Sequence, residues 1–396
     1  IYFFMYLPSE SKEIKIPAIL EFGNLTMRAG FAGEDMPYVM QDSLLGCYSQ
    51  PDSKKKKLFD LNTYVKPSGN FTIVSPVKNR THLNLELLES YVEYTVTNKL
   101  QASLENTPLF FVEPPIHNKE ARLNIVQAMF ETFNIPGIYF HKAPLLTLYV
   151  FARENATILD IGANTTHCTP IVDGFIASNG IMKVDFGGED LTEDLMNILK
   201  ARGNQITSYA DFKYKTNSEN FLMDDSTSEY LNYCRYDLMR EIKHQMCKLY
   251  DTKIDKLKWK EGVDNTTFEL PDKTLLVMSK EIYSVPERLF QSPPNHEFQG
   301  LHTLIGQSLE KIDVEPRKEL MSNIIITGGG SLIPNMIDRL QKELMDNDVL
   351  SLGYKAKIFA SMSDTERRYS NWLGGSILAS MSTFPNLCMT KQEYEE

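Results

Sequence analysis

The sequence predicts an α/β protein made of two duplicated halves. Strand-like runs at 16–22, 71–74 and 109–112 alternate with helical ones, and this alternation is typical of α/β architecture. A strand that runs through an acidic residue and a glycine into a small polar turn occurs twice, at Glu21 and again at Asp160. With 396 residues, 42% of them apolar, the chain is long enough for two or more domains with substantial cores, since domains usually take about 100–200 residues.

Apolar residues at helical spacing predict the helices that alternate with these strands. They are Leu87, Leu88, Tyr91 and Leu100 in a helix that starts near Asn84, and Leu123, Val126, Met129 and Phe130 in the next one. The second half starts with the turn near Asp160 and ends with a buried-strand pattern at 324–327, a glycine run and a helical stretch at 332–344.

The two glycine turns are suited to holding a polyphosphate between them. Gly23 and Gly162 let the backbone approach a ligand without a side chain in the way, and successive N–H groups in a tight turn form an anion-binding concavity. The glycine run at Gly328 follows a strand and opens a helix, as strand-to-helix nucleotide loops do. Each piece alone is more often an ordinary turn, so it is the order of the three that indicates a nucleotide site.

In that order, the three elements resemble the actin family, which belongs to a larger group with the sugar kinases and the ATPase domain of the heat-shock chaperones. The resemblance covers nearly all of the chain. Supporting runs lie at 28–37, 186–192, 366–380 and 391–394, of which the third is the most specific. The resemblance implies an actin-like ATPase fold, in which two duplicated α/β lobes with four subdomains surround a nucleotide cleft.

Matching motifs also imply where the lobes begin and end. The first lobe takes 1–150 and is completed by 370–396, with a small subdomain near 39–73; the second takes 151–369, with a small subdomain near 187–297 that contains a surface insertion near 204–230.

The resemblance implies that the cleft binds ATP or ADP, with Mg²⁺ as the candidate metal. A triphosphate needs backbone donors, a cation and a metal held through waters by carboxylates, here Glu21 and Asp160. The residues that match the phosphate loops are Gly23, Asn24, Leu25 and Arg28, then Gly162, Ala163, Asn164 and Thr165. Those that match the ribose and base positions are Gly188, Lys243, Gly328, Gly329, Ser331 and Leu332, with Arg368 beside the adenine. Taken alone, Lys243 would be interpreted as a solvated helix lysine.

Four positions that would contact the nucleotide or its metal depart from the family's pattern. Glu21 stands where actins have an aspartate, so its carboxylate reaches one methylene further toward the metal. Ala163 replaces a second metal-organising aspartate, Asn164 replaces a glycine, and His244 replaces the acidic residue that contacts the ribose. We therefore expect the nucleotide affinity and the metal preference to differ from those of actin.

The hydrolytic apparatus is incomplete. Ala143 occupies the place of the glutamine that positions the attacking water, and a methyl group cannot orient water. His167 matches the family's histidine, but phosphoryl transfer depends mainly on alignment and charge stabilisation. We assign no catalytic residue and predict very slow or absent ATP hydrolysis. A working ATPase of the cytoskeletal actin type is the alternative, whereas a sugar kinase would need a carboxylate base that the region 114–117 lacks.

The region 372–384 matches the wall of a groove between the lobes that accepts an amphipathic partner helix. The candidate groove residues are Leu378, Met381, Thr383 and Leu387, with Tyr149 on the opposite wall. The alternative is that they are core residues of a terminal helix. Filament formation is not expected, because 41–76 does not resemble actin's self-contact loop.

Within the family, the chain is most similar to the fourth class of nuclear actin-related proteins. The cues are the runs at 28–35, 365–370 and 393–396. This similarity implies a nuclear scaffold subunit that pairs with actin on a long helix of a chromatin-remodelling ATPase or a histone acetyltransferase platform. A cytoplasmic or ciliary actin-related subunit is the alternative.

Composition excludes several other functions. The formal charge of -11 argues against direct nucleic-acid binding, which relies on a basic surface. The five cysteines lack paired metal-ligand spacing and indicate a reduced compartment. The apolar run at 1–7 has no basic flank and is too short to span a membrane, so no membrane segment is expected. The four lysines at 54–57 predict a solvated loop or, alternatively, a nuclear-import signal.

Overall fold

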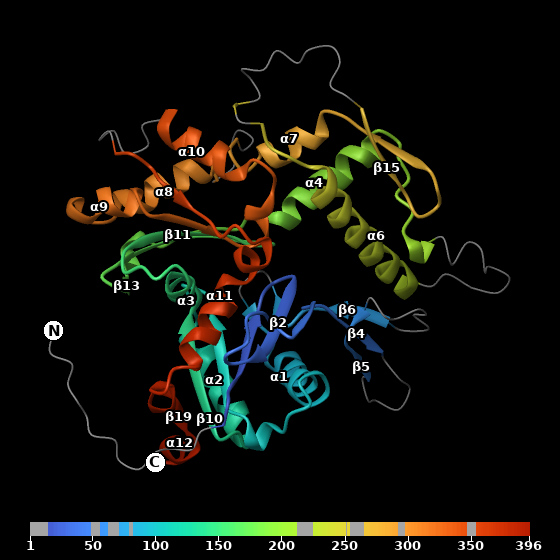
Figure 1. Ribbon diagram of the computed structural model, residues 1–396. Coiled ribbons are helices and arrows are strands. Elements are labelled where there is room, and N and C mark those ends of the chain that lie inside the picture. Colours follow the sequence, from blue (N-terminus) through green and yellow to red (C-terminus); the bar gives the residue numbers. More distant parts are fainter. Residues whose placement is uncertain are drawn as a thin grey trace.

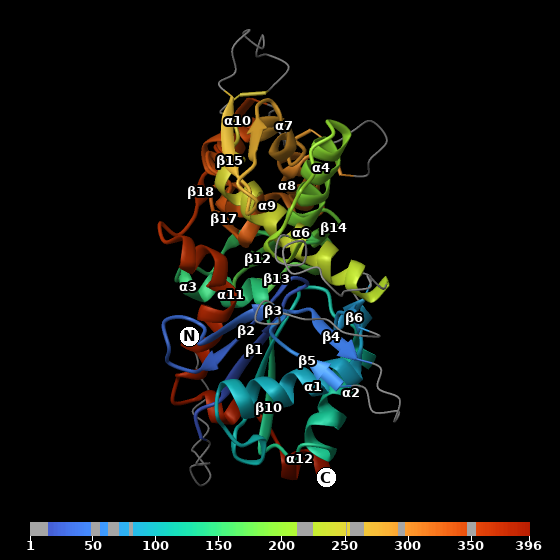
Figure 2. The same ribbon diagram turned by 90° about the vertical axis from the view of Figure 1, so that its right-hand side faces the viewer.

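The computed structural model describes residues 15–48, 56–61, 71–78, 82–211, 225–250, 252–253, 265–291, 298–346 and 354–396. These residues form two α/β lobes, one above the other in Figure 1, and the turned view in Figure 2 shows the same division. At the junction of the lobes, α3 (Ala143–Val150) packs against α11 (Asp364–Ala379). The prediction of two α/β lobes is confirmed.

The first lobe is built on a six-stranded sheet. In spatial order its strands are β19 (Met389–Thr390), β10 (Gly137–Lys142), β9 (Leu109–Glu113), β1 (Ala18–Phe22), β2 (Thr26–Phe31) and β3 (Val39–Asp42). β10, β9 and β1 run parallel, whereas β1, β2 and β3 are successively antiparallel. The first three residues of β1 are fully buried, as expected for a central strand that is covered on both faces.

The second lobe repeats this arrangement. Its sheet contains, in order, β13 (Phe175–Ile176), β12 (Thr166–Val172), β11 (Ala156–Ile161), β17 (Ile324–Thr327) and β18 (Ile358–Phe359), and β14 (Met182–Val184) also pairs with β12. β11, β17 and β18 are parallel, and β11 forms an antiparallel hairpin with β12. The β1–β2 and β11–β12 hairpins therefore hold equivalent places in the two sheets, which confirms the predicted duplication.

The first helix of the first lobe begins where its sequence predicts. The side chain of Asn84 accepts a hydrogen bond from the N–H of Leu87 at 3.3 Å and so caps α1 (Leu85–Glu93), which satisfies one of its unpaired first-turn donors. α2 (Lys119–Glu131) follows after β9. Of the apolar residues predicted for its core face, Leu123 is instead 66% exposed.

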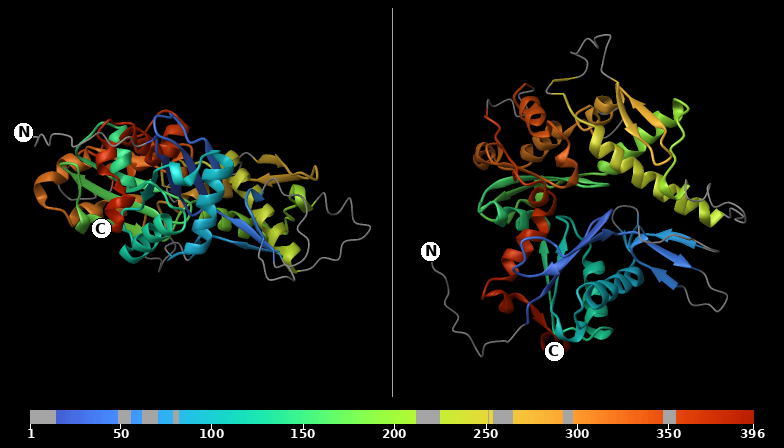
Figure 3. Two further views of the ribbon diagram at one scale, coloured as in Figure 1. Left: turned by 90° about the horizontal axis from the view of Figure 1, so that it is seen from below. Right: turned by 45° about the vertical axis from the view of Figure 1, so that its right-hand side comes forward.

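The second lobe carries most of the remaining helices. They are α4 (Gly188–Ala201), α6 (Asp225–Met246), α7 (Glu281–Glu287), α8 (Leu301–Glu310), α9 (Val314–Met321) and α10 (Met336–Asp346), accompanied by the hairpin of β15 (Thr266–Glu269) and β16 (Leu275–Met278). α6 packs on α4 and, at its other end, contacts the small sheet of the first lobe. That sheet consists of β5 (Lys56–Leu58), β4 (Leu45–Tyr48) and β6 (Phe71–Val74). In the right-hand view of Figure 3, the yellow-green α6 runs toward these blue strands. Shorter elements are β7 (Val77–Lys78), β8 (His82–Leu83) and α12 (Lys391–Glu395).

The helix expected from residue 332 begins later than predicted. Residues Gly329–Leu332 form a short 3₁₀ turn, and α10 starts only at Met336. Ile333 is extended, with φ -57° and ψ 127°, because a residue that precedes a proline, here Pro334, is disfavoured in the helical region. This prediction of the helix start was wrong.

Some sequence predictions lie outside the described residues. The expected insertion at 204–230 includes residues 212–224, which are outside them, and α6 already begins at Asp225. The apolar run at 1–7 and the lysines at 54 and 55 are also outside them. Across the described segments, no helix combines the length and the apolar character needed to cross a bilayer.

Candidate functional site

Two equivalent glycine turns connect the hairpin strands of the lobes. The N–H of Gly23 donates to the carbonyl oxygen of Thr26 at 3.1 Å, and the N–H of Gly162 donates to that of Thr165 at 3.0 Å. A Cβ atom added to Gly23 would lie 2.7 Å from the Thr26 oxygen, and one added to Gly162 would lie 2.8 Å from the Thr165 oxygen. Both turns therefore require a residue without a side chain.

Asn371 of α11 lies between the carboxylates that precede the two turns. Its Nδ2 atom is 3.3 Å from Oδ2 of Asp160, at the end of β11, and 3.5 Å from Oε1 of Glu21, at the end of β1. Its Oδ1 atom accepts a hydrogen bond from the hydroxyl of Thr147 at 2.6 Å, which fixes the orientation of the amide. Sequence reasoning missed this residue, although a buried asparagine inside a helix is itself a signal that a polar partner is near.

Arg28 completes the charge arrangement at the first turn. Its guanidinium donates to Oε1 of Glu21 at 2.6 Å and lies 5.1 Å from the centre of the Tyr369 ring. Burial raises the pKa of Asp160, although the nearby Asn371 amide and the charge of Arg28 oppose the shift. Two carboxylates and one guanidinium thus converge where the two turns meet.

Glu21 and Asp160 fit the task of holding a metal through waters. The Oε2 atom of Glu21 is buried and has no hydrogen-bond partner among the described residues, so it is available to a bound group. Mg²⁺ typically uses one or two carboxylates together with phosphate oxygens and waters. Among the described residues no group of three or more His, Cys, Asp or Glu side chains is arranged to hold a metal. A Mg²⁺ ion here would neutralise phosphate charge, and Ala163 offers it no carboxylate.

The second turn is held by the start of α4. The N–H of Gly188 donates to the carbonyl oxygen of Gly162 at 3.0 Å, and the N–H of Glu189 donates to that of Ala163 at 2.7 Å. A Cβ atom on Gly187 would lie 2.6 Å from both carbonyl oxygens, so the close approach depends on glycine there. The turn and the N-terminus of α4 therefore form one rigid unit.

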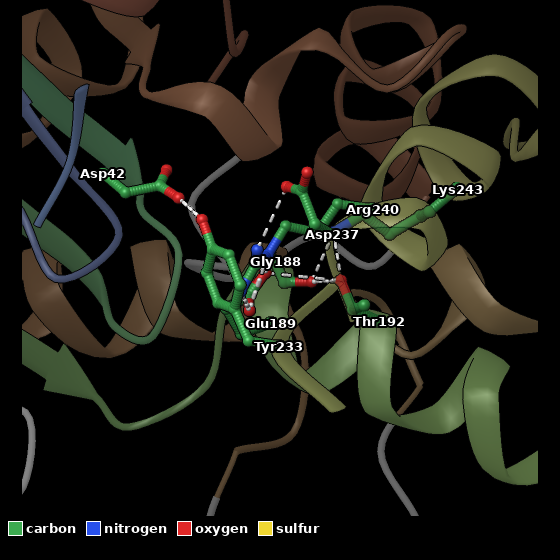
Figure 4. A network of polar contacts seen from close by, with 8 residues as sticks. All are labelled: Asp42, Gly188, Glu189, Thr192, Tyr233, Asp237, Arg240 and Lys243. Carbon is green, nitrogen blue, oxygen red and sulfur yellow. Dashed lines mark hydrogen bonds and ion pairs between the residues drawn. The ribbon is translucent and has the colours of Figure 1, made fainter. Parts of the chain in front are cut away.

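Lys243 is buried rather than solvated. Its Nζ atom donates to the carbonyl oxygen of Gly188 at 2.6 Å and to the hydroxyl of Thr192 at 2.8 Å, as Figure 4 shows. Burial lowers the pKa of Lys243 to about 8. This lysine joins α6 to α4 beside the second turn.

The Gly328 loop approaches the same place from β17. Gly328 has φ +85°, and a Cβ atom there would lie 2.4 Å from Oδ1 of Asp160. The hydroxyl of Ser331 donates to the carbonyl oxygen of Gly328 at 2.7 Å, which closes the loop. A Cβ atom on Gly329 would meet no atom within 4 Å, so this part of the loop borders open space. Leu332 is half-buried at the end of the loop.

Arg368, expected beside the adenine, and His244, expected at the ribose-contact position, are both exposed. Partial desolvation lowers the pKa of His244, and the positive charges of Lys243 and Arg368 lower it further, which indicates that the three side chains lie close enough to interact. The neighbouring Arg367 donates to the carbonyl oxygen of Ser331 at 3.4 Å, so it is this arginine that supports the Gly328 loop.

A contact between the lobes lies on the side of the small subdomains. The hydroxyl of Tyr233 in α6 donates to the carboxylate of Asp42 in β3 (Figure 4). Nearby, the N–H of Ile73 donates to Oε2 of Glu229 at 3.2 Å. The ring of Tyr233 packs in an apolar cluster with Leu61, Phe71 and Tyr230. Sequence reasoning did not find this contact.

α6 also connects that contact to the second turn. Arg240, two turns beyond Tyr233, donates to both carboxylate oxygens of Glu189 at 2.8–2.9 Å. The backbone N–H of Glu189 in turn donates to Ala163. A rigid path therefore runs from the edge of the first lobe to a candidate phosphate loop.

The two positions expected to matter for hydrolysis, Ala143 and His167, carry no charged side chain near neutral pH. Ala143 is 7% exposed at the start of α3. His167 lies opposite Asp160 in the β11–β12 pair. Burial lowers the pKa of His167 to about 4, and the charge of Lys183 adds to the effect, so the ring is neutral near pH 7.

The candidate groove residues separate into two groups. Tyr149, Met381 and Leu387 are 38%, 50% and 47% exposed, and Thr383 is exposed as well. Leu378 is 9% exposed and packs in a cluster with Ile19, Phe110, Leu146 and Trp372. Leu378 is therefore a core residue, which is the alternative interpretation given above for the candidate groove residues.

Comparisons with known proteins agree with this architecture. A family model described as Actin matches residues 13–396. Actin-related protein 4 of Arabidopsis thaliana is 28% identical over an alignment that covers 96% of this chain and 95% of the relative. Actin-related protein 4 of Oryza sativa subsp. japonica is 27% identical with the same coverage. Centractin of Schizosaccharomyces pombe is 30% identical, and the alignment covers 96% of this chain and 94% of the relative.

Proposed function

Because this chain belongs to the actin family, whose members bind nucleotide with a divalent metal, we propose that it is a nucleotide-stabilised scaffold protein with little ATP hydrolysis. Its cleft holds ATP or ADP, and the bound nucleotide ties the two lobes together. The protein acts in the nucleus as a subunit of a chromatin-remodelling or histone acetyltransferase complex, where it pairs with actin on a partner helix.

The observation that carries the proposal is the position of the Asn371 amide, within 3.5 Å of carboxylates from both lobes. A glycine turn follows directly after each of these carboxylates, one turn in each lobe. A ligand with several phosphates would contact both turns at once, so its binding energy would oppose separation of the lobes. Such a ligand stabilises the folded chain whether or not it is hydrolysed.

The proposal of weak hydrolysis is supported by the side chains at the two positions that the family resemblance connects with hydrolysis. Ala143 offers no hydrogen bond to a water, and neutral His167 supplies no positive charge. Loss of one preorganised polar group costs about 10²–10³ in rate in well-studied enzymes. The nucleotide therefore acts mainly as a structural ligand.

The partner helix is supported by the exposed apolar side chains Tyr149, Met381 and Leu387. An amphipathic helix can bury them in a groove. The similarity to two plant proteins named Actin-related protein 4 supports assignment to that class.

Purification of the native protein from nuclei tests the proposal. We expect mass spectrometry to recover actin and a remodelling or acetyltransferase subunit, and chromatography of the extracted nucleotide to give about one ATP or ADP per chain. Recovery of the chain without any partner protein would overturn its membership of such a complex, and recovery without nucleotide would overturn the structural role of ATP or ADP.

The alternative functions are those of a cytoskeletal-type actin-like ATPase, which would form polymers, or of a non-nuclear actin-related subunit. Sedimentation in Mg-ATP separates the polymerising ATPase from the scaffold. Polymer formation coupled to phosphate release would favour the ATPase, whereas a soluble chain with no phosphate release favours the scaffold.

A further inference from the structure

Three aromatic side chains, one of them the candidate groove residue Tyr149, form a hydrogen-bonded stack. The Nδ1 atom of His141 lies 3.1 Å from the hydroxyl of Tyr139, and its Nε2 atom lies 3.2 Å from the hydroxyl of Tyr149. The ring centres are 5.8 Å apart in both pairs, with interplanar angles of 18° and 21°. We call these three residues the tyrosine–histidine stack.

Local structure brings the three residues together. Tyr139 and His141 are two residues apart in β10, so their side chains point to the same face of the sheet. β10 ends at Lys142, and α3 begins at once with Ala143, which carries Tyr149 back over that face. The stack therefore links β10 to α3, the helix that carries the candidate groove residue Tyr149.

The stack contains one more hydrogen-bond donor than it uses. Burial lowers the pKa of His141 to about 4, so at neutral pH the ring has one N–H donor and one acceptor nitrogen. The two tyrosine hydroxyls bring two further donors. Two hydrogen bonds within the stack use two of these three donors, so one tyrosine O–H is left over.

The surroundings decide which hydroxyl keeps the unused donor. The ring of Tyr139 packs edge-on against Phe110 and Phe384, with ring centres 5.1 and 5.4 Å apart, whereas Tyr149 is 38% exposed. A donor without an acceptor costs more in apolar surroundings than in water. This favours the arrangement in which Tyr139 donates to Nδ1, the Nε2–H group of His141 donates to Tyr149, and the O–H of Tyr149 is directed to solvent.

We propose that Tyr149 is a specificity residue, held by His141, whose O–H selects a partner helix with one carboxylate or amide side chain on its otherwise apolar face. This inference rests on the proposed function, because it assumes that a helix occupies the groove. The exposed Met381 and Leu387 supply apolar contact but no hydrogen bond of comparable direction. The backbone carbonyls inside a helix are already paired, so the acceptor must come from a side chain.

Selection from a displayed library of short amphipathic helices, with randomised apolar-face positions and a fixed polar face, tests the proposal. The full chain, Tyr149→Phe and the exposed control Tyr209→Phe serve as targets. We expect the full chain and Tyr209→Phe to enrich helices with Asp, Glu, Asn or Gln at one fixed apolar-face position. With Tyr149→Phe that enrichment should disappear, and a helix selected on the full chain should bind about five- to tenfold more weakly, the loss typical of one hydrogen bond.

Each other outcome overturns the proposal in a recognisable way. Enrichment of uniformly apolar helices by the full chain contradicts the specificity role but leaves the groove intact. Failure to select any helix contradicts the groove, and with it that part of the proposed function. Nitrogen NMR of labelled histidine tests the donor assignment separately, because it reports which ring nitrogen of His141 carries the proton. We expect the Nε2–H tautomer, and the Nδ1–H tautomer would contradict the assignment.

Discussion

The hydroxyl of Tyr233 in the second lobe donates a hydrogen bond to the carboxylate of Asp42 in the first. Burial raises the pKa of Asp42, and the hydrogen bond from Tyr233 opposes that shift. The contact lies between β3 of the six-stranded sheet and α6, whereas α3 packs against α11 at the other junction of the lobes. The lobes are therefore joined on both sides of the candidate nucleotide site.

Removal of this hydrogen bond should speed nucleotide release. In Tyr233→Phe the ring remains in its apolar cluster while the bond to Asp42 is lost, so opening of the cleft becomes easier by about 1–2 kcal/mol, or roughly tenfold in rate. Displacement of a fluorescent ATP analogue, followed by stopped flow, measures this rate. Tyr236→Phe, in the same helix, is the matched control, and equal release rates in both variants would contradict the role of the contact.

A glutamine at position 143 should raise the rate of hydrolysis. Ala143→Gln restores a polar group that can orient water, and we expect an increase of about tenfold or more in single-turnover ATP hydrolysis. Because position 143 is 7% exposed, the larger side chain can also disturb packing. Ala143→Met, of similar length but unable to orient water, controls for this effect. An actin-like rate in the unmodified chain would refute the prediction of weak hydrolysis.

An exposed methionine gives a clean test of the groove. Met381→Ala should weaken binding of the partner helix about tenfold, because it removes apolar contact area at a residue that is 50% exposed in the free chain. Thermal unfolding should be unchanged. Met362→Ala, at a 96% exposed residue before the other end of α11, is the control and should bind normally. Equal affinity of the two variants would argue against the groove.

Leu378→Ala is a less selective test of the groove. Leu378 packs in the core, so its truncation should cost about 2–5 kcal/mol of stability in addition to any effect on binding.

Stability should fall as the pH is lowered through the histidine range. Burial lowers the pKa of His141 to about 4, below the usual value of about 6.5 that applies in the unfolded chain. Between these values the unfolded chain binds more protons, so the free energy of unfolding, fully present above about pH 6.5, declines as the pH falls toward 4. Since the ring is only partly buried, we expect a contribution on the order of 1 kcal/mol. Urea unfolding at about pH 7 and about pH 5 measures it. His141→Phe should show a smaller decline, and an identical decline in both proteins would contradict this assignment.

The glycine turns could be predicted because their signal is local. Gly23 and Gly162 each follow a buried strand and an acidic residue, and the hydrogen bonds that they form reach only three residues along the chain. The duplicated sheets follow from the same strand patterns. The start of α10 was missed because the effect of Pro334 on Ile333 outweighed the helical pattern of the apolar residues.

The contacts that join the lobes could not be predicted in the same way. Asn371 is 211 residues from Asp160, and Tyr233 is 191 residues from Asp42, so no local pattern marks either pair. His141 lies two residues from Tyr139, but its contact with Tyr149 depends on the turn from β10 into α3. The contacts of Asn371 with Asp160 and of Tyr233 with Asp42 exist only once both lobes have folded.

Calorimetric titration of ATP into nucleotide-free protein tests the central claim most directly, when it is repeated with Gly23→Ala and Gly162→Ala. We predict that the unmodified chain binds one nucleotide. Each variant should bind it more weakly, because each added Cβ would lie within 2.8 Å of a carbonyl oxygen and distort one of the two turns. Absence of binding to the unmodified chain, or loss of affinity in one variant only, would contradict a nucleotide held by both lobes.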